Sequence, residues 1–522
     1  MKRVLIFTVL LFLPFLNKAY HIDDPVFLVI ARQIRQAPLI PYDFLYHWTM
    51  TPLPAWVVSL HPPLNSYFLA LIGLAAEEKE IPTHAAYLLL TLGCAALMLA
   101  LARRFCRHPI LATVLTLASP GFFVTATNVM ADVPLLFFWL LSVWIVVAAA
   151  QDRRPQLLCA AAAAMACAAM TKYFGLALVP LLGAYWWLKT RRLSLPMAGF
   201  FIPLLVVILW GWYSVSHCGL FHPLASAGFA AATQRDFISQ IGATTAFLGG
   251  CLLWPVFALP LIARLPARWL SAVLAVMGAV LLISPPAAGW LWAVMVLGGV
   301  AVAALACAAV AASSDAETRL LGLWVAGVMI FALRFNWTVN ARILLPAAFP
   351  AAVLVLRWIE SLDNSRPMLI GLACSCLAAL FISFKLALAD QEIAGAGRDF
   401  ARSTARREII QGRNAYFTGH WGFQYYMEKE GALPFDFKNT KLAPGDKIFI
   451  STNNNWSMPL RPPRFPGVST IARLPVAHKQ WLTTVDAEGE RAGFYTSLFG
   501  SVPFNIGRSL KADIFLIQEY RP

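Results

Sequence analysis

Long apolar segments follow one another from the N-terminus to about residue 390, separated by short polar loops. Many are long enough to cross a hydrocarbon core of about 30 Å as helices. They lack the apolar–polar alternation of barrel strands, and helices satisfy all their backbone hydrogen bonds internally. The pattern therefore predicts an all-α polytopic membrane protein with about thirteen transmembrane helices. The predicted spans are residues 4–17, 83–102, 110–127, 133–150, 157–171, 173–188, 197–215, 243–262, 270–284, 289–312, 320–335, 343–358 and 368–389. A polar external loop is expected near residues 216–240.

One apolar segment, residues 64–76, is too short to be a span. At a rise of about 1.5 Å per residue it covers about 20 Å, and it ends at the acidic run of residues 77–80. We expect it to lie at the outer membrane interface. The first external loop, residues 18–82, is then expected to contain juxtamembrane helices.

The basic residues indicate the orientation of the chain. The composition is 59% hydrophobic and 13% charged, with a formal net charge of +15. Arginine and lysine gather in short loops between spans, as in cytoplasmic loops of multispanning proteins, and this distribution argues against nucleic-acid binding. We expect a cytoplasmic N-terminus, an uncleaved first helix and an extracytoplasmic C-terminal region. The loop residues are Arg103, Arg104, Arg107, Arg153, Arg154, Lys189, Arg191, Arg192, Arg264 and Arg268.

The composition changes near residue 390. Residues 390–522 carry charges of both signs, many Pro and Gly turns and no spanning run. Short strand-like pieces at 415–417, 447–451 and 513–517 accompany a predicted helix at 423–429. We therefore expect a membrane domain of residues 1–389 and a small α/β domain of residues 390–522 on the outer face.

Several ionisable residues stand at the outer ends of predicted spans, where charges are expensive. An isolated charge can instead snorkel into water, and Asp24 is also suited to cap the helix that follows it. Five residues of both signs at one depth are better explained by a shared polar cavity. They are Asp23, Asp24, Asp132, Lys172 and Arg342, and His61 stands in the same external layer.

These residue types fit transfer chemistry on a lipid phosphate. A carboxylate can act as general base toward an acceptor hydroxyl or amine, and like charge and burial should raise the pKa of one of Asp23 and Asp24. Lys172 and Arg342 can bind a phosphate. In a lipid-phosphate sugar, attack at the anomeric carbon expels a phosphate whose growing charge the cations stabilise.

The motifs resemble those of the GT-C glycosyltransferases. They are DD after the first helix, HPPL, ADVPLLFF, TKY and NARILLP, and together they span about residues 1–390. The resemblance is to the bacterial branch that is protein O-mannosyltransferase-like and lipid A aminoarabinose transferase-like. It implies a GT-C fold in the bacterial inner membrane with the C-terminal domain in the periplasm. It also implies an inverting transfer from a polyprenyl-phosphate sugar to an acceptor outside the cytoplasm.

The resemblance also implies catalytic residues. Asp23 matches the first acidic residue of the family's Asp-Glu pair, as base or acceptor-positioning group. Asp24 replaces the usual glutamate, which leaves the division of labour between the two open. Asp132 matches an acidic residue at the membrane edge near the acceptor.

Substrate-binding residues follow from the same motifs. Lys172 matches a lysine near the donor phosphate, and Tyr173 completes that TKY motif. Arg342 matches a basic residue before the helix that lines the lipid groove. His61 stands where relatives have His or Lys before Pro, at the acceptor or the phosphate. Arg32 either meets phosphate or covers the headgroup surface.

Other readings remain open at this stage. A secondary transporter or lipid flippase is the main alternative, but such proteins place charges near the midplane and contain internal repeats. No cofactor is implied; an acidic pair can hold a divalent cation, but a second cluster of oxygen ligands is missing from the sequence. The expected partners are membrane lipid, the polyprenyl-phosphate sugar donor and a lipid, glycan or protein acceptor. Which sugar and which acceptor are used is left open.

The stretch FTGHWGFQYYMEKEGALPFD of the outer domain resembles a segment of uncharacterised family members. Trp421, Tyr425 and Tyr426 in it can stack on a sugar ring, but packing inside a small domain is favoured. His420 lacks partners for a metal site.

Overall fold

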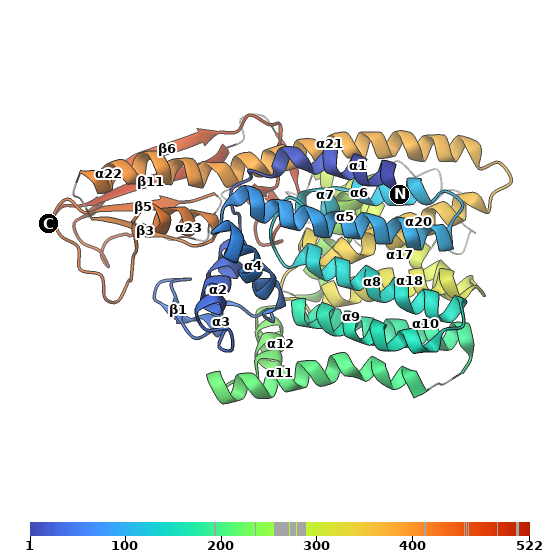
Figure 1. The fold of residues 1–522 in the computed structure, drawn as a ribbon. Coiled ribbons are helices and arrows are strands. Elements are labelled where there is room, and N and C mark those ends of the chain that lie inside the picture. The colour runs from blue at the N-terminus through green and yellow to red at the C-terminus, as the bar shows by residue number, and fades with distance from the viewer. Residues whose placement is uncertain are drawn as a thin grey trace.

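The computed structural model joins a bundle of long helices to a sheet-containing outer domain at one end of the bundle (Figure 1). Residues 255–262 of the predicted span 243–262 and most of the predicted span 270–284 lie outside the described residues. The structure describes residues 1–192, 195–234, 236–254, 271, 278, 289–411, 414–453, 455, 457, 459–487, 489–507 and 511–522.

Most of the bundle consists of apolar helices. Seven described helical segments are long and apolar enough to cross a membrane, so the prediction of about thirteen spans stays a prediction. The seven are Glu80–Phe105, Asp132–Gln151, Pro196–Cys218, Gly289–Ala312, Ala316–Arg334, Ala341–Glu360 and Arg366–Ile410. The described helices are α1 (Lys2–Phe12), α2 (Asp24–Gln36), α3 (Ala55–Val58), α4 (Leu64–Ala76), α5 (Glu80–Phe105), α6 (Pro109–Leu117), α7 (Pro120–Thr125), α8 (Asp132–Gln151), α9 (Leu158–Thr171), α10 (Leu178–Thr190), α11 (Ile202–Cys218), α12 (His222–Thr233), α13 (Phe237–Leu252), α17 (Gly289–Ala312), α18 (Ala316–Arg334), α19 (Ala341–Leu344), α20 (Ala348–Glu360), α21 (Arg366–Phe400), α22 (Arg406–Ile410) and α23 (Trp421–Lys429).

The observed helices differ from the predicted spans at several breaks. The predicted span 110–127 is divided into α6 and α7, because Pro120 lacks a backbone N–H and holds Ser119 in an extended conformation. Residues 216–240, which we expected to be a polar loop, contain helix α12. Lys172 is extended between the end of α9 and the short 3-10 turn Tyr173–Ala177.

Residues 18–82, which the sequence predicts to be the first external loop, form the junction between the bundle and the outer domain. Figure 1 shows α2, α3 and α4 at the end of the bundle that adjoins the outer domain. The observed α4, Leu64–Ala76, has the bounds of the predicted short helix, and Glu77 ends it in the left-handed conformation. This junction is where the candidate site lies.

The outer domain is built on a mixed sheet with the strand order β4-β3-β5-β11-β6. Strand β3 pairs in parallel with β4 and β5, and β11 pairs antiparallel with β5 and β6. The predicted strands and helix of this region are therefore confirmed. The described strands are β1 (Leu45–Tyr46), β2 (Leu53–Pro54), β3 (Ala415–Thr418), β4 (Leu433–Pro434), β5 (Lys447–Ser451), β6 (Val468–Ala477), β7 (Leu482–Thr483), β8 (Val485–Asp486), β9 (Ala492–Gly493), β10 (Asn505–Ile506) and β11 (Lys511–Tyr520).

No break in the chain marks the proposed boundary at residue 390. Helix α21 continues from the bundle into the outer domain as far as Phe400, and a π-helical turn, Ala401–Ala405, leads on to α22 (Figure 1). The two parts of the molecule therefore share one continuous helix.

Helix α23 fastens the outer domain to the first external loop. The backbone N–H of Tyr20 donates to the hydroxyl oxygen of Tyr426 at 2.9 Å, and that hydroxyl donates to Glu80 at 3.0 Å. A Cβ on Gly422 would stand 2.3 Å from the carbonyl oxygen of Tyr20, so a side chain there would force the two segments apart. The ring of Tyr425 meets that of Tyr20 edge to face. These aromatic residues pack at the junction between the two parts.

Candidate active site

Four charged side chains meet at the junction, and we call them the charged cluster. Lys172 Nζ lies 2.6 Å from Asp132 Oδ1, and Arg342 Nη1 lies 2.9 Å from Asp23 Oδ2. Arg342 Nη1 is also 3.8 Å from Asp132 Oδ2. Carboxylates and cations therefore alternate, and each charge has an opposite charge beside it.

Helix ends bring these residues together. Asp132 is the first residue of α8, where the helix dipole favours a carboxylate, and Lys172 follows the last residue of α9, where it favours a cation. Arg342 lies in the short helix α19, whose first turn is capped by Asn340 accepting from the N–H of Ile343 at 2.9 Å. The local sequence thus places the charges at helix termini.

Asp23 stands in a strained turn. Ile22 has a φ of +48°, which a β-branched residue rarely adopts. Hydrogen bonds on both sides hold the turn: Tyr426 accepts from the N–H of Tyr20, and Asp24 accepts from the N–H of His21 at 2.9 Å. Surrounding structure therefore fixes the direction in which Asp23 points.

Asp24 does not face the charged cluster. Its buried carboxylate accepts from the backbone N–H groups of His21, at 2.9 Å, and of Val129, at 3.0 Å. It thereby ties the turn of Asp23 to the segment that leads into Asp132. Burial raises the pKa of Asp24 to about 7, and repulsion by Asp23 contributes less. The expected raised pKa within this pair is confirmed and falls on Asp24.

The charged cluster retains free hydrogen-bonding capacity. Asp132 Oδ2 and Arg342 Nε are buried and have no hydrogen-bond partner among the described residues. The side chain of Asp23 is 26% exposed, whereas that of Asp132 is 2% exposed. Buried polar atoms in native proteins are normally paired, so these two atoms mark a place where a further polar group fits.

His61 lies beside the charged cluster. Its ring stacks on Phe27 with centroids 5.8 Å apart, and its carbonyl oxygen accepts from the hydroxyl of Tyr42 at 2.7 Å. Burial, together with the positive charge of Lys172, lowers the pKa of His61 to about 3. The imidazole is therefore neutral at pH 7.

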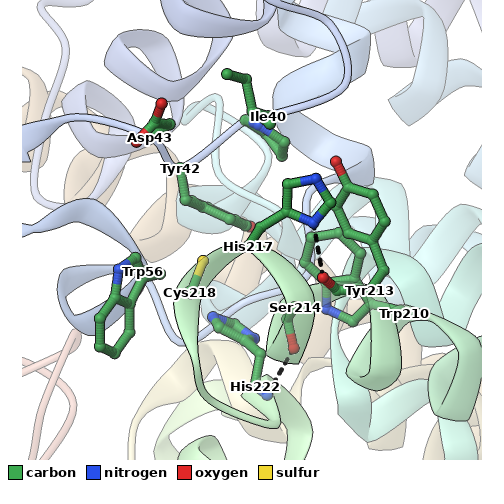
Figure 2. Close-up of a pocket in the computed structure, with 11 residues that line it drawn as sticks. Ile40, Tyr42, Asp43, Trp56, Trp210, Tyr213, Ser214, His217, Cys218 and His222 are labelled. Carbon is green, nitrogen blue, oxygen red and sulfur yellow. Dashed lines mark hydrogen bonds between the residues drawn. The ribbon is translucent and has the colours of Figure 1, made fainter.

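Tyr173 points away from the charged cluster into an aromatic group. Its hydroxyl is 2.7 Å from His222 Nδ1 and accepts from Trp210 Nε1 at 2.9 Å. His222 and Trp210 line a cavity of about 120 Å³ between the loop after α2 and the end of α11 (Figure 2). Figure 2 also shows Ser214 accepting from the N–H of His222. The polar groups of this cavity wall therefore hydrogen-bond to one another.

Arg32 lies elsewhere as well. Its guanidinium donates to both carboxylate oxygens of Glu78, at 3.3 and 2.8 Å, and Arg35 donates to the same carboxylate at 2.8 Å. The Arg32 side chain is 50% exposed. The structure thus brings together Asp23, Asp132, Lys172 and Arg342, places His61 beside them, and directs Asp24, Tyr173 and Arg32 to other partners.

Sequence reasoning missed a second, sealed cluster next to the site. Lys18 and Asp390 are fully buried and lie 2.5 Å apart. Lys18 also donates to Thr127 at 3.0 Å and to Asn128 at 2.7 Å. Asp390 accepts from Tyr495 of the outer domain at 2.6 Å. Lys18 follows the first apolar run and Asp390 follows the last one, so each resembles an ordinary flanking charge.

The charged cluster does not fit a divalent cation. Among the described residues there is no group of three or more His, Cys, Asp or Glu side chains arranged to hold a metal ion. The oxygens of Asp23 and Asp132 are directed at Arg342 and Lys172, and two neighbouring positive charges oppose a third. We therefore derive no step through a metal.

One family model matches part of the chain. Residues 60–212, under a third of the chain, match the family model described as dolichyl-phosphate-mannose-protein mannosyltransferase. This segment contains His61, Asp132 and Lys172. No curated protein sequence matches the chain significantly.

Three of the solved structures that are similar to this chain are the following. ArnT from Cupriavidus metallidurans bound to undecaprenyl phosphate is 16% identical, with 86% of this chain and 92% of that chain covered and a TM-score of 0.44. The oligosaccharyltransferase of Archaeoglobus fulgidus in complex with Zn and sulfate is 14% identical, with coverages of 83% and 62% and a TM-score of 0.49. The arabinofuranosyltransferase AftD from Mycobacteria is 13% identical, with coverages of 100% and 40% and a TM-score of 0.43.

Proposed function

We propose that this chain, whose residues 60–212 match a mannosyltransferase family model, is a GT-C glycosyltransferase that transfers a sugar from a polyprenyl-phosphate donor to an acceptor outside the cytoplasm. The observation that carries the proposal is the charged cluster. Two cations stand side by side at helix ends, and a buried carboxylate oxygen and a buried guanidinium nitrogen there are unpartnered among the described residues. A lipid-linked phosphate with a polar sugar matches that capacity.

The proposed reaction is a single displacement. The Asp23 carboxylate takes the proton from an acceptor hydroxyl, and the acceptor oxygen forms a bond to the anomeric carbon of the sugar. The bond between that carbon and the phosphate oxygen breaks, and its electron pair stays on the departing polyprenyl phosphate. One attack from the face opposite the phosphate inverts the anomeric configuration.

Lys172 and Arg342 act on the departing phosphate. Donors fixed where negative charge develops stabilise the transition state more than the ground state. The planar guanidinium of Arg342 can meet two phosphate oxygens, and the ammonium of Lys172 acts as a point charge. Asp132 keeps both cations in place, because its carboxylate lies 2.6 Å from Lys172 and 3.8 Å from Arg342.

The resting ion pair links donor binding to the base. Arg342 Nη1 lies 2.9 Å from Asp23 Oδ2 in the structure, so this carboxylate oxygen is engaged by the guanidinium while the donor is absent. A donor phosphate at Arg342 competes with Asp23 for the guanidinium. The Asp23 oxygen that leaves Arg342 is then free to accept a hydrogen bond from the acceptor, so the acceptor is engaged after the donor binds.

The other predicted residues support this arrangement. Asp24 holds the turn of Asp23 through its bonds to His21 and Val129. The neutral imidazole of His61 lies next to the cations and can hydrogen-bond the acceptor or the phosphate. In this proposal the junction and the outer domain lie on the periplasmic side of a bacterial inner membrane, and the acceptor is a lipid, glycan or protein.

The test is turnover with the purified protein. Labelled polyprenyl-phosphate sugars are incubated with cell-envelope acceptor fractions in detergent or vesicles. We expect transfer by the wild type and a loss of about 100- to 10,000-fold in Asp23→Asn, the range that removal of a general base produces. Asp399→Asn is the matched control, since Asp399 is 76% exposed on the outer domain.

Two outcomes contradict the proposal. One is a folded Asp23→Asn variant that transfers sugar at the wild-type rate. The other is movement of a solute or lipid across vesicles by a wild-type protein that forms no new glycosidic bond, which is the transporter reading.

A further inference from the structure

A segment of the outer domain returns to the charged cluster. The carbonyl oxygen of Phe494 accepts from the N–H of Ala341 at 2.9 Å. The N–H of Ser497 donates to the carbonyl oxygen of Val339 at 2.8 Å. Backbone bonds from the outer domain thus hold the residues directly before Arg342.

Side chains strengthen this attachment. The hydroxyl of Thr338 lies 3.0 Å from that of Thr496 and 2.9 Å from that of Ser497, and all three residues are buried. Hydrogen bonds within a buried set of this kind fix one geometry, because an unpaired member would be costly. The short helix α19 therefore cannot shift independently of the outer domain.

Tyr495 lies in the middle of this segment and contacts both clusters. The Arg342 Cζ atom stands 5.5 Å from the centroid of the Tyr495 ring. The edge of the His21 ring meets the same ring at a centroid distance of 5.0 Å. The Tyr495 hydroxyl donates to Asp390 at 2.6 Å and accepts from Asn128 at 3.1 Å.

The hydroxyl anchors the ring on the sealed cluster. Asp390 is held by Lys18 at 2.5 Å and by Thr484 of the outer domain at 2.5 Å. Tyr495 is 2% exposed, so its ring has little freedom to turn. A fixed aromatic face attracts a guanidinium and constrains its orientation.

We propose that Tyr495 is a positioning residue of the active site. Its ring holds the Arg342 guanidinium where the donor phosphate arrives, and the outer domain thereby completes a site whose charges come from the bundle. The part played by the phosphate rests on the proposed function, whereas the contact between Tyr495 and Arg342 does not.

Two substitutions separate the ring from the hydroxyl. Tyr495→Leu removes the aromatic face, and we expect KM for the polyprenyl-phosphate sugar to rise about 2- to 30-fold, the range of cation–π energies. Tyr495→Phe keeps the face and removes the bond to Asp390, so KM stays near the wild-type value while the melting temperature falls. A role in domain packing alone predicts that KM is unchanged in both.

A double-mutant cycle tests whether the effect passes through Arg342. If it does, Tyr495→Leu has little further effect on KM in an Arg342→Gln background, because the cation that the ring orients is gone. Independent, additive effects overturn the proposal. Tyr425→Leu is the control: Tyr425 is also an outer-domain tyrosine at the junction, with Lys429 over its ring at 5.6 Å, and we expect its variant to keep the wild-type KM.

The same variants distinguish this inference from the proposed function. Binding of polyprenyl phosphate without sugar is measured for each, together with thermal unfolding in detergent. If the wild type neither binds this lipid nor transfers sugar, the proposed function fails. The unfolding cycle then decides the positioning contact by itself: coupled stabilities of Tyr495 and Arg342 support it, and additive ones refute it.

Discussion

Two clusters of buried opposite charges lie at the junction, and they differ in how completely they are satisfied. In the sealed cluster both Lys18 and Asp390 are 0% exposed, and polar side chains surround the pair. In the charged cluster Asp23 is 26% exposed and Asp132 keeps an unpartnered oxygen among the described residues. A saturated buried pair has no capacity for another molecule, whereas an unsaturated one does.

The comparison also shows how one cluster supports the other. Tyr495 and His21 touch both, since His21 Nε2 lies 3.6 Å from Asp390 and belongs to the turn that carries Asp23. The sealed cluster therefore holds in place residues that contact the charged cluster. Substitutions in the two clusters should therefore differ in their effects. Those in the sealed cluster should lower the stability of the protein, and those in the charged cluster should lower its catalytic activity.

The largest expected effect on stability comes from the sealed cluster. Lys18→Met leaves Asp390 buried without its cation, and we expect the free energy of unfolding to fall by about 3–5 kcal/mol. Thermal or denaturant unfolding of the purified protein in detergent measures this. The molecules that remain folded should keep their turnover number, because Lys18 lies outside the charged cluster and is bonded to Asp390, Thr127 and Asn128.

Two controls sharpen that experiment. The double variant Lys18→Met with Asp390→Leu removes both charges and should regain much of the loss. Lys189→Met removes a partly exposed lysine whose partner, Glu317, keeps Gln151 and Tyr185 as donors, so we expect a change of about 1 kcal/mol or less. If Lys18→Met were as mild as Lys189→Met, the sealed cluster would not hold its neighbours in place as described above.

A smaller effect, on function, is expected from the charged cluster. Arg342→Lys keeps the positive charge beside Asp23 but removes the planar fork. Loss of one charge-assisted hydrogen bond to the donor phosphate should weaken donor binding about tenfold. Binding of polyprenyl phosphate measures this, and the melting temperature should stay close to that of the wild type. A large fall in stability with unchanged binding of polyprenyl phosphate would mean that Arg342 stabilises the fold and does not bind the donor.

The sequence predicted the charged cluster because its members break a rule. Asp132, Lys172 and Arg342 stand at the apolar ends of helices, where a charge has a high cost and therefore calls for an explanation. The short helix at 64–76 and the strands of the outer domain also followed from length and pattern. These signals are local, so a single sequence contains them.

The rest depends on contacts between distant segments. Lys18 and Asp390 are separated along the chain by almost the whole membrane domain, and nothing near either residue indicates the other. Tyr495 lies in an outer domain that the composition marks as separate, although α21 runs into that domain without a break. The direction of Tyr173 toward His222 likewise depends on α12, which appeared in the sequence as a polar loop.

The stability of the protein should depend on pH through Asp24. Burial raises the pKa of Asp24 from 3.8 to about 7, so between these values the folded protein binds more protons than the unfolded chain. The contribution of Asp24 to stability is therefore full below pH 4 and is lost as the pH rises through 7, with a slope of at most about 1.4 kcal/mol per pH unit. Melting temperatures measured from pH 4 to 7 should be flatter in Asp24→Asn.

The control for this slope is internal to the site. His21 has a pKa lowered by burial, so its own contribution has the opposite sign and increases as the pH rises through about 6.5. Subtracting the wild-type profile from that of Asp24→Asn removes the His21 contribution and leaves that of Asp24. An unchanged slope would mean that Asp24 is ionised throughout and pairs in another way.

The smallest effect is expected from a substitution of Arg32, a partly exposed arginine that can be compared with the buried Arg342. Arg32 and Arg342 are both paired with a carboxylate, but the side chain of Arg32 is 50% exposed and that of Arg342 is 11% exposed. In Arg32→Ala, Glu78 keeps its bond to Arg35 at 2.8 Å, so we expect a loss of less than about 1 kcal/mol in the unfolding free energy. Donor KM and kcat should match the wild type. A clear rise in donor KM would instead place Arg32 in the path of the phosphate, and exposure would then be a poor guide to which arginine of this junction meets the substrate.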